Sequence, residues 1–269
     1  MQSSNNAGVT SLIDTHCHLD FDVFDDCRGD IIATCENRNF KAIIVPGVIQ
    51  SDWLHLLGIC KQYKLLHAAL GIHPYYVSSH TVMQLESLVD YIAKHNPIAV
   101  GEIGLDYFCD DVDRCRQVMF FSRQLEIAKE AGLPVLLHVR KAHDQVLQLI
   151  KKTKFDCGGI VHAFSGSEQQ AVHYLERGFK LGVGGAATYD RAKKIHRILR
   201  DFPLPSFVLE TDSPDLRPCF AKETNNTPLN LFGIANCIAD IKGVSVSTLC
   251  EVTTSTAQAL FCSSFEFEP

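Results

Sequence analysis

The chain has 269 residues, of which 46% are hydrophobic and 21% are charged, a composition that excludes a wholly disordered or fibrous protein. Its 25 Lys and Arg residues against 31 Asp and Glu residues give a formal net charge of -6. This balance argues against nucleic-acid binding through a broad basic face, although it allows a local cationic site.

The distribution of apolar residues and cysteines argues against further classes of protein. The longest apolar stretch runs from Ala42 to Ile49 and is interrupted by Pro46, far short of the ~20 residues of a membrane-spanning helix. Residues 1–11 are polar and lack the basic and apolar regions of a signal peptide. The 11 cysteines form no C-x-x-C pair, unlike those of a secreted disulfide scaffold. We therefore expect reduced thiols, no membrane association and a cytoplasmic location.

Short apolar runs alternate with amphipathic segments along the chain, and no long linker divides them. We expect residues 1–11 to be a polar extension, residues 12–262 a single domain and residues 263–269 a tail. Eight runs rich in Val, Ile, Leu or Phe have the composition of strands buried on both faces. These predicted strands are Leu12–His18, Ala42–Val48, Leu66–His73, Ile98–Leu105, Pro134–Arg140, Gly159–Phe164, Phe179–Gly184 and Phe207–Asp212.

The segments between the runs are predicted to be helices. The clearest is Asp113–Glu130, because apolar residues recur in it at helical spacing and Gly132 and Pro134 follow it. Similar patterns predict helices over Ser51–Tyr63, Gln84–His95, Ala142–Lys151, Glu168–Arg177, Arg191–Arg200, Pro228–Ile241 and Val246–Phe261.

Eight strand–helix units predict a parallel sheet, because parallel strands need crossover connections and the right-handed rule places the helices outside. Such units close naturally into a (β/α)₈ TIM barrel, which typically takes about 250 residues. The alternative is an open doubly wound sheet. A glycine-rich phosphate loop after the first strand would favour that alternative, but the first strand ends in His16, Cys17 and His18.

Side chains that can bind metals lie at or near the carboxyl ends of several predicted strands. In a barrel these ends meet on the face where active sites form. Residues i and i+2 of a strand point to the same side, so His16 and His18 can grip one ion. Imidazoles suit Zn, Mn, Fe or Ni, and carboxylates also admit harder ions. The six candidates are His16, His18, Glu102, His138, His162 and Asp212.

Four imidazoles and two carboxylates exceed what one tetrahedral ion needs, so the sequence favours two divalent metals, with Zn, Mn or Mg as candidates. Two ions about 3.5–4 Å apart can share a hydroxide and stabilise both oxygens of a phosphoryl displacement. A single histidine in a strand, such as His138, is more often a core residue or a surface tip than a ligand, whereas Glu102 would be costly to bury without a partner. We expect a bridging Glu102 between two ligand sets, which are His16, His18 and Asp212 for one ion and His138 and His162 for the other.

Three further residues have an open interpretation. Arg140 shares a strand face with His138 and can reach a phosphate oxygen, or it forms a structural salt bridge. His73 either contacts the scissile group or caps its strand. Asp106 either orients a ligand imidazole or caps the start of a loop. We predict substrate binding for His73 and Arg140.

These motifs together resemble the TatD family of metal-dependent deoxyribonucleases, which belongs to the amidohydrolase-like (β/α)₈ enzymes. The resemblance runs in order from about residue 12 to about residue 261. It rests on the segments Asp14–Asp20, Gly71–Pro74, Gly101–Asp106, His138–Arg140, His162–Gly166 and Glu210–Pro214.

The resemblance implies hydrolysis of DNA phosphodiesters with divalent metals, several family members being 3′-to-5′ exonucleases. It places the family's metal ligands on the same six candidates. It also implies that Asp212 accepts the proton of the attacking water and that Glu102 is catalytic. DNA, as single strands or strand ends, is then the expected partner, and no obligate protein partner is evident.

Three functions remain open at this point. The first is a two-metal phosphodiesterase acting on single-stranded DNA. The second is an amidohydrolase-type enzyme acting on a small amide, lactone or ester. Many such enzymes bridge their metals with a carbamylated lysine, and Glu102 in the fourth strand favours the first function. The third is a binding or scaffold protein without activity, which the apparently complete ligand set argues against.

Overall fold

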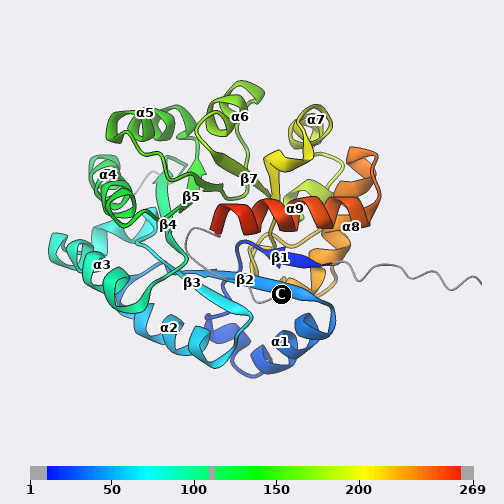
Figure 1. Cartoon of the computed structure of the whole chain (residues 1–269), viewed down its shortest axis with the longest axis horizontal. Coiled ribbons are helices and arrows are strands. Elements are labelled where there is room, and N and C mark those ends of the chain that lie inside the picture. The colour runs from blue at the N-terminus through cyan, green and yellow to red at the C-terminus, as the bar shows by residue number, and fades with distance from the viewer. Residues whose placement is uncertain (1–10, 109–112, 262–269) are drawn as a thin grey trace, which may run out of the picture.

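The computed structural model of the protein describes residues 11–108 and 113–261. Within these ranges eight parallel strands form one sheet whose spatial order follows the chain, with helices around it (Figure 1). The strands are β1 (Leu12–Asp14), β2 (Phe40–Pro46), β3 (Leu66–Leu70), β4 (Ala99–Asp106), β5 (Val135–Arg140), β6 (Gly159–Val161), β7 (Phe179–Val183) and β8 (Phe207–Leu209). All but the last residue of the predicted extension, and the whole predicted tail, lie outside the described residues.

The two ends of the sheet meet, so the strands enclose a barrel. The backbone N–H of Thr15, just beyond β1, donates to the carbonyl of Leu209 at the end of β8 (3.0 Å). Further along the same two segments, the N–H of Asp212 donates to the carbonyl of His16 (2.8 Å). The predicted (β/α)₈ barrel is confirmed, and the open doubly wound sheet is excluded.

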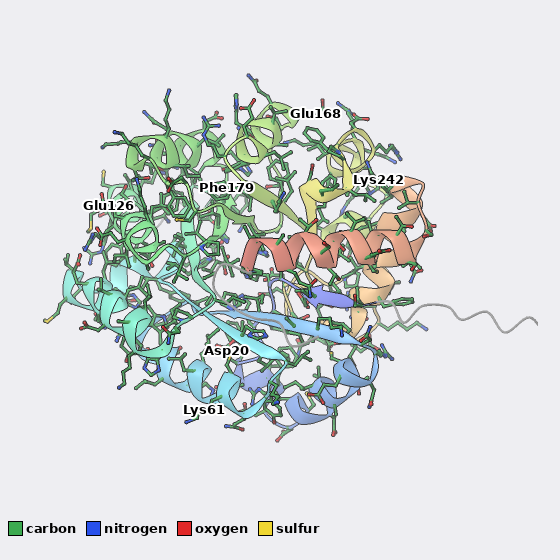
Figure 2. All side chains as sticks on the ribbon, in the orientation of Figure 1. Asp20, Lys61, Glu126, Glu168, Phe179 and Lys242 are labelled. Atoms are coloured by element: carbon green, nitrogen blue, oxygen red, sulfur yellow. The ribbon has the colours of Figure 1, made fainter. Side chains whose placement is uncertain are left out.

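Helices follow the strands and cover the outside of the barrel. Their solvent faces carry charged side chains such as Lys61, Glu126 and Glu168, whereas Phe179 of β7 is fully buried (Figure 2). The α-helices of the described ranges are α1 (Arg28–Asn37), α2 (Trp53–Gln62), α3 (Val82–His95), α4 (Arg114–Ala131), α5 (His143–Thr153), α6 (Glu168–Leu175), α7 (Lys193–Asp201), α8 (Leu231–Lys242) and α9 (Val246–Phe261).

Helix α4 shows how the sequence sets the helix ends. The side chain of Asp113 accepts a hydrogen bond from the N–H of Arg116 (3.0 Å), which caps the start of the helix. Gly132 ends it in a left-handed conformation, with φ of 67°. Both ends agree with the prediction to within one residue.

Helix α1 is absent from the predicted helices. Its hydrophobic buried residues are Ile31, Ile32 and Cys35, too few to produce a clear helical pattern. The helix is anchored instead by a buried arginine, since Arg28 donates to the carbonyl of Leu19 (2.5 Å). The predicted helices at 191–200 and 228–241 begin later than expected, at Lys193 and Leu231.

The hydrophobic core has an outer layer between strands and helices and an inner layer within the barrel. The inner layer includes Ile13, Ile44 and Val208, and it also contains Ala257 and Phe261 of α9. Helix α9 crosses the strands in Figure 1 and contacts β1 and β8. It therefore closes the end of the barrel where the strands begin, and the opposite end is left for the site.

No single helix within residues 11–108 and 113–261 combines the length and hydropathy needed to cross a membrane. Helices α8 and α9 satisfy the length and hydropathy criteria only when they are taken together, and they are separated by a bend of 107°.

Candidate metal centre

Glu102 lies among four imidazoles at the open end of the barrel. Its Oε2 is 3.2 Å from Nε2 of His16 and 3.7 Å from Nε2 of His18. Its Oε1 is 3.0 Å from Nδ1 of His138 and 3.6 Å from Nε2 of His73. The side chain is only 4% exposed. The central position predicted for Glu102 is therefore the one that the carboxylate occupies.

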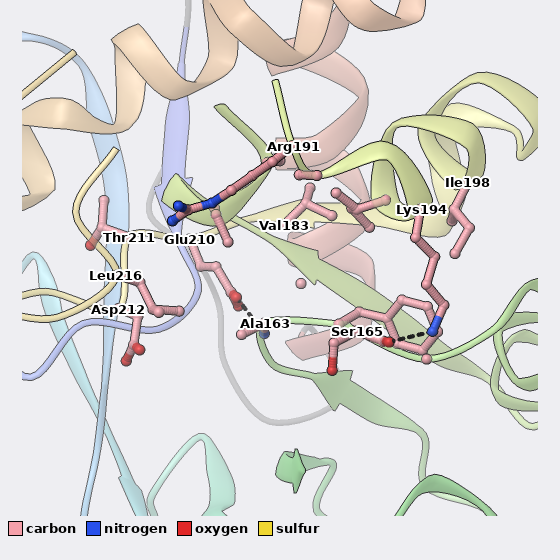
Figure 3. A pocket seen from close by; sticks show the side chains of 18 of the residues that line it. Ala163, Ser165, Val183, Arg191, Lys194, Ile198, Glu210, Thr211, Asp212 and Leu216 are labelled. Carbon is pink, nitrogen blue, oxygen red and sulfur yellow. Dashed lines mark hydrogen bonds between the residues drawn. The ribbon is translucent and has the colours of Figure 1, made fainter. Parts of the chain in front are cut away.

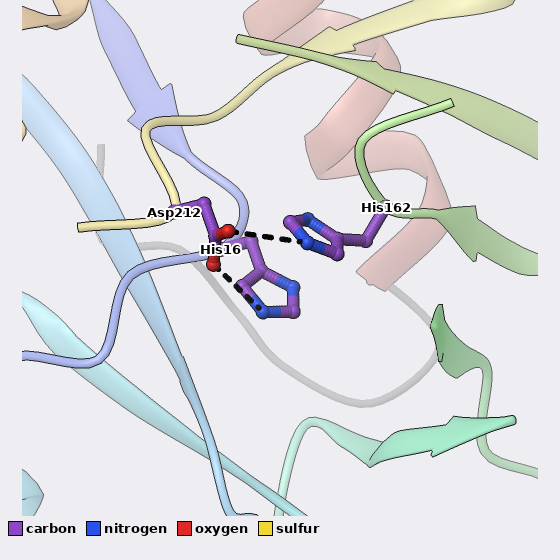
Figure 4. Close-up of side chains that lie close together, drawn as sticks. All are labelled: His16, His162 and Asp212. Carbon is purple, nitrogen blue, oxygen red and sulfur yellow. Dashed lines mark ion pairs between the residues drawn. The ribbon is translucent and has the colours of Figure 1, made fainter. Parts of the chain in front are cut away.

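Asp212 faces the same group of histidines from the end of β8. Its Oδ1 lies 3.6 Å from Nε2 of His18 and 3.7 Å from Nε2 of His16. Its Oδ2 lies 3.5 Å from Nε2 of His162, and Figure 4 shows the carboxylate reaching towards the rings of His16 and His162. These two rings stack with centroids 3.8 Å apart.

The loop conformations after the strands bring these side chains inward. His16 and His18 lie beyond β1, which ends at Asp14, so the expectation that they share a face within the strand is wrong. His162 and Asp212 likewise follow β6 and β8 rather than belonging to them. Asp212 has a φ of 54°, a strained conformation for a residue with a Cβ, and its backbone bond to His16 helps to hold it.

Three compact groups of potential metal ligands result. They are His16, His18 and Glu102; His16, His162 and Asp212; and His73, Glu102 and His138. The grouping differs from the predicted one, because His162 lies with His16 and Asp212, whereas His138 lies with His73. His73, predicted to bind substrate, is thus also placed as a potential ligand.

The ring nitrogens in this site fit divalent cations. Both nitrogens of His16 and Nδ1 of His18 are buried, and among the described residues they have no well-aligned hydrogen bond. Buried polar atoms are normally paired, so these nitrogens are suited to an ion instead. Imidazole nitrogens mixed with carboxylate oxygens are the donors that Zn and Mn accept.

The ionisation of the central carboxylate agrees with this interpretation. Burial by itself raises the pKa of Glu102, but His16, His73 and His138 outweigh it and hold that pKa well below its ordinary value. Glu102 is therefore an anion within the site, as a bridging ligand must be.

A second carboxylate orients His138. Nε2 of His138 is 2.7 Å from Oδ2 of Asp106, a fully buried residue whose Oδ1 accepts from the N–H of Phe108 (2.8 Å). Burial opposes ionisation of Asp106, yet these hydrogen bonds lower its pKa to about 2. Of the two interpretations of Asp106, the structure supports both, since the carboxylate orients the imidazole and caps the loop.

Glu210 does the same for His162, and the sequence analysis gave it no role. Its Oε1 lies 3.1 Å from Nδ1 of His162 and accepts from the N–H of Ala163 (2.6 Å). Burial would lower the pKa of His162, but Glu210 and Asp212 together raise it well above its ordinary value. The available signal was a carboxylate two residues before Asp212, directly after the buried run of β8.

Three further histidines, one on each of helices α5, α6 and α7, lie away from this group. His143 and His196 are buried, and Nε2 of His196 donates to the carbonyl of Ala187 (2.8 Å). His173 is exposed on α6.

A cleft of about 670 Å³ opens over the candidate ligands. His73 and Arg140 both line it, as their predicted role requires. Nδ1 of His73 accepts from the N–H of Tyr75 (3.1 Å), which leaves Nε2 facing Glu102. Arg140 donates to the hydroxyl of Tyr75 (2.8 Å) and stacks on Phe108 at 4.2 Å, so its guanidinium is fixed at the rim.

Comparison with known families agrees with this site. Residues 13–262 match the sequence profile of the family described as TatD related DNase. The chain belongs to the TatD family. Because the match covers nearly the whole chain, the barrel and all six candidate ligands lie within the region that defines the TatD family.

Relatives of this TatD-family chain are named as hydrolases. An Escherichia coli K12 protein named uncharacterized metal-dependent hydrolase YjjV is 39% identical over 77% of this chain and 81% of its own. Bacillus subtilis YabD, with the same description, is 30% identical over 93% of this chain and 98% of its own. The crystal structure of E. coli YjjV, described as a TatD homolog, superposes with a TM-score of 0.90, covering 94% of this chain and 99% of that one at 34% identity. This chain is accordingly a TatD-family metal-dependent hydrolase with a candidate metal centre.

Proposed function

We propose that this protein is a divalent-metal-dependent deoxyribonuclease that hydrolyses phosphodiester bonds of single-stranded DNA or strand ends, in the 3′-to-5′ direction. The observation that carries the proposal is the position of Glu102 among His16, His18, His73 and His138, with Asp212 opposite. Divalent ions held by such a group lower the pKa of water and neutralise charge that develops on a phosphoryl group.

The protein's own groups have distinct tasks in this proposal. Asp212 has one oxygen towards His16 and His18 and the other towards His162, and its side chain is 14% exposed. This position supports Asp212 as the proton acceptor for the attacking water. Glu102 is more deeply buried and would be shared by two ions held at the site.

The rim of the cleft suits a phosphate flanked by bases. The guanidinium of Arg140 is held beside Asp106 at 3.8 Å and can offer its remaining N–H groups to a phosphate oxygen. Tyr75, Tyr76 and Phe108 are partly exposed aromatic side chains on the same side of the site. Aromatic rings next to cations are typical of surfaces that bind single-stranded nucleic acid.

The experiment uses metal-depleted protein reloaded with Zn²⁺, Mn²⁺ or Mg²⁺ and single-stranded DNA labelled at its 5′ end. We expect a ladder that shortens from the 3′ end, with activity at least a hundredfold lower in Glu102→Gln and Asp212→Asn. Asp201→Asn, at an exposed position of α7, is the matched control and should retain full activity.

The opposite outcome has a defined form. Full activity in either site variant would refute the assigned roles. If no nucleic acid is cleaved under any metal while a lactone or an N-acyl amide is hydrolysed with loss in Glu102→Gln, the amidohydrolase alternative replaces the nuclease.

A further inference from the structure

A second cavity adjoins the metal centre on the side of β6, β7 and β8. It has a volume of about 260 Å³ and lies between these strand ends and α7 (Figure 3). Ala163, Ser165, Ala186, Leu216 and Asp212 line both this cavity and the metal cleft. A group bound in the cavity is therefore next to the reacting atoms.

The inner wall of the cavity is mostly apolar and built from small side chains. The buried carboxylate of Glu210 also lines it, with Oε1 turned to Nδ1 of His162 at 3.1 Å. Gly182, Gly184 and Ala187 form the strand side, and Ile198 of α7 lies opposite. The hydroxyl of Thr211, also in the wall, is already engaged by Asp14 (2.6 Å). The volume of the cavity exceeds that of several water molecules, each of which occupies about 30 Å³ in the liquid. Such a wall favours a ring or another apolar group over a charged one.

The exposed part of the cavity lining includes three cationic residues. Arg191 precedes α7, and Lys193 is its first residue. Nζ of Lys194 donates to the carbonyl of Ser165 (2.8 Å), a bond drawn in Figure 3. Three cations at one place are notable on a chain with a net charge of -6. The cavity therefore matches a ligand that joins an apolar ring to an anionic group.

We propose that this cavity binds the base of the nucleotide next to the scissile phosphodiester, and that Arg191 and Lys194 contact the phosphate attached to that nucleotide. The inference rests on the proposed function, because it assigns a part of the same substrate. The continuity of the cavity with the metal cleft and the position of the cations carry it. A base seated there places the adjoining scissile phosphodiester towards Asp212, which lines both the cavity and the cleft.

The first test measures binding without turnover. Isothermal titration compares deoxyadenosine 5′-monophosphate with 2-deoxyribose 5-phosphate, which lacks the base. We expect the wild-type protein to bind the nucleotide at least tenfold more tightly. Ala186→Leu, at the boundary between cavity and cleft, should remove this difference, whereas Ala33→Leu at an exposed position of α1 should preserve it. Equal affinities in the wild type, or an unchanged difference in Ala186→Leu, would overturn the proposal.

The second test addresses the cations. Arg191→Ala should weaken binding of both ligands at least fivefold and reduce the dependence of binding on salt, because both ligands carry the phosphate. Arg200→Ala, an exposed arginine of α7 outside the cavity, should match the wild type. Identical binding by the two variants contradicts the role of Arg191.

Failure of the nuclease proposal remains distinguishable from failure of this one. A protein that cleaves DNA but gains no affinity from the base retains the proposed function and loses the base site. A protein that prefers the nucleotide in the binding assay but cleaves no phosphodiester retains the base site and loses the nuclease.

Discussion

His138 is held between two carboxylates, and this arrangement sets what the residue can do. Glu102 approaches Nδ1 at 3.0 Å and Asp106 approaches Nε2 at 2.7 Å. The carboxylate of Asp106 fixes the orientation of the ring, and in metal sites such partners increase the basicity of the ligand. Asp106 is thus a positioning residue, which would act on a bound ion through His138.

We expect Asp106→Asn to weaken metal binding by about 10- to 100-fold while the fold is retained, because the substitution preserves volume and removes the charge that orients His138. Calorimetric titration of the metal-free protein with the metal measures the change in affinity. Asp201→Asn is the control at an exposed position. Metal affinity equal to that of the wild type would show that Asp106 only caps its loop.

His143 offers a separate prediction about acid stability. Burial, with a smaller effect of Lys194, lowers the pKa of His143 to about 4 from 6.5. The unfolded chain therefore binds a proton between these values while the folded protein does not, so stability falls as the pH is lowered from 6.5 to 4. The shift corresponds to about 3 kcal/mol in the free energy of unfolding when fully developed.

The measurement is urea unfolding of wild type and His143→Gln at pH 7.5 and pH 5. We expect the wild type to lose more stability between the two pH values than the variant, which lacks the titrating imidazole. Equal losses would mean that His143 is accessible to protons in the folded protein.

At the scale of residues, the sequence motifs predicted the chemistry better than the pairing. Glu102 and Asp212 are found among the histidines, as the residue types indicated. The grouping of His73 with His138, and of His162 with His16, depends on the path of the chain after each strand. Those paths include left-handed residues such as Ala163 and Asp212, which no strand periodicity predicts.

At the scale of elements, β7 makes room for the support that β8 gives to His162. A Cβ on Gly182 would clash with the carboxylate of Glu210, with the carboxyl carbon 2.7 Å away. The glycine in β7 is thus a requirement of the neighbouring strand rather than of a turn.

Gly182→Ala is expected to displace Glu210 from His162 and to lower metal affinity at least tenfold. Gly58→Ala in α2 is the matched control, because nothing lies within 4 Å of its added Cβ. This control should keep its metal affinity and gain up to ~1 kcal/mol of stability, since alanine favours helix. Metal titration and urea unfolding of both variants decide the matter, and unaltered metal affinity in Gly182→Ala would contradict the requirement.

The order and type of most elements could be predicted from the sequence, since the apolar runs of buried strands are distinct from helical patterns. The strand ends could not. The predicted first strand extended to His18, whereas β1 ends at Asp14. The residue type does not show whether a residue is held by strand pairing or by side-chain contacts in the site. The boundary of a strand therefore depends on tertiary contacts.

At the scale of the whole molecule, metal binding and folding are coupled, because the ligands come from strands spread over the chain. A ligand that binds the folded state alone stabilises it by about 2.7 kcal/mol at a hundredfold excess over its Kd. We expect EDTA to lower the melting temperature of the metal-loaded protein and Zn²⁺ or Mn²⁺ to restore it.

The control for this prediction is the stoichiometry. Elemental analysis should find two ions per chain in the wild type and in Glu251→Gln, an exposed variant, but less than one in Glu102→Gln. If EDTA leaves the melting temperature unchanged in protein shown to contain two ions, metal binding does not contribute to the stability of the fold.

The seam where β1 meets β8 has a consequence for the order in which the site comes into being. His16 and His18 are synthesised long before Asp212, which joins them through its bond to the carbonyl of His16. A nascent chain that ends after β6 contains His73, Glu102 and His138, but it lacks Asp212, the proposed proton acceptor. If Asp212 is the proton acceptor, a hydrolase built in this way is inert until β8 closes the barrel.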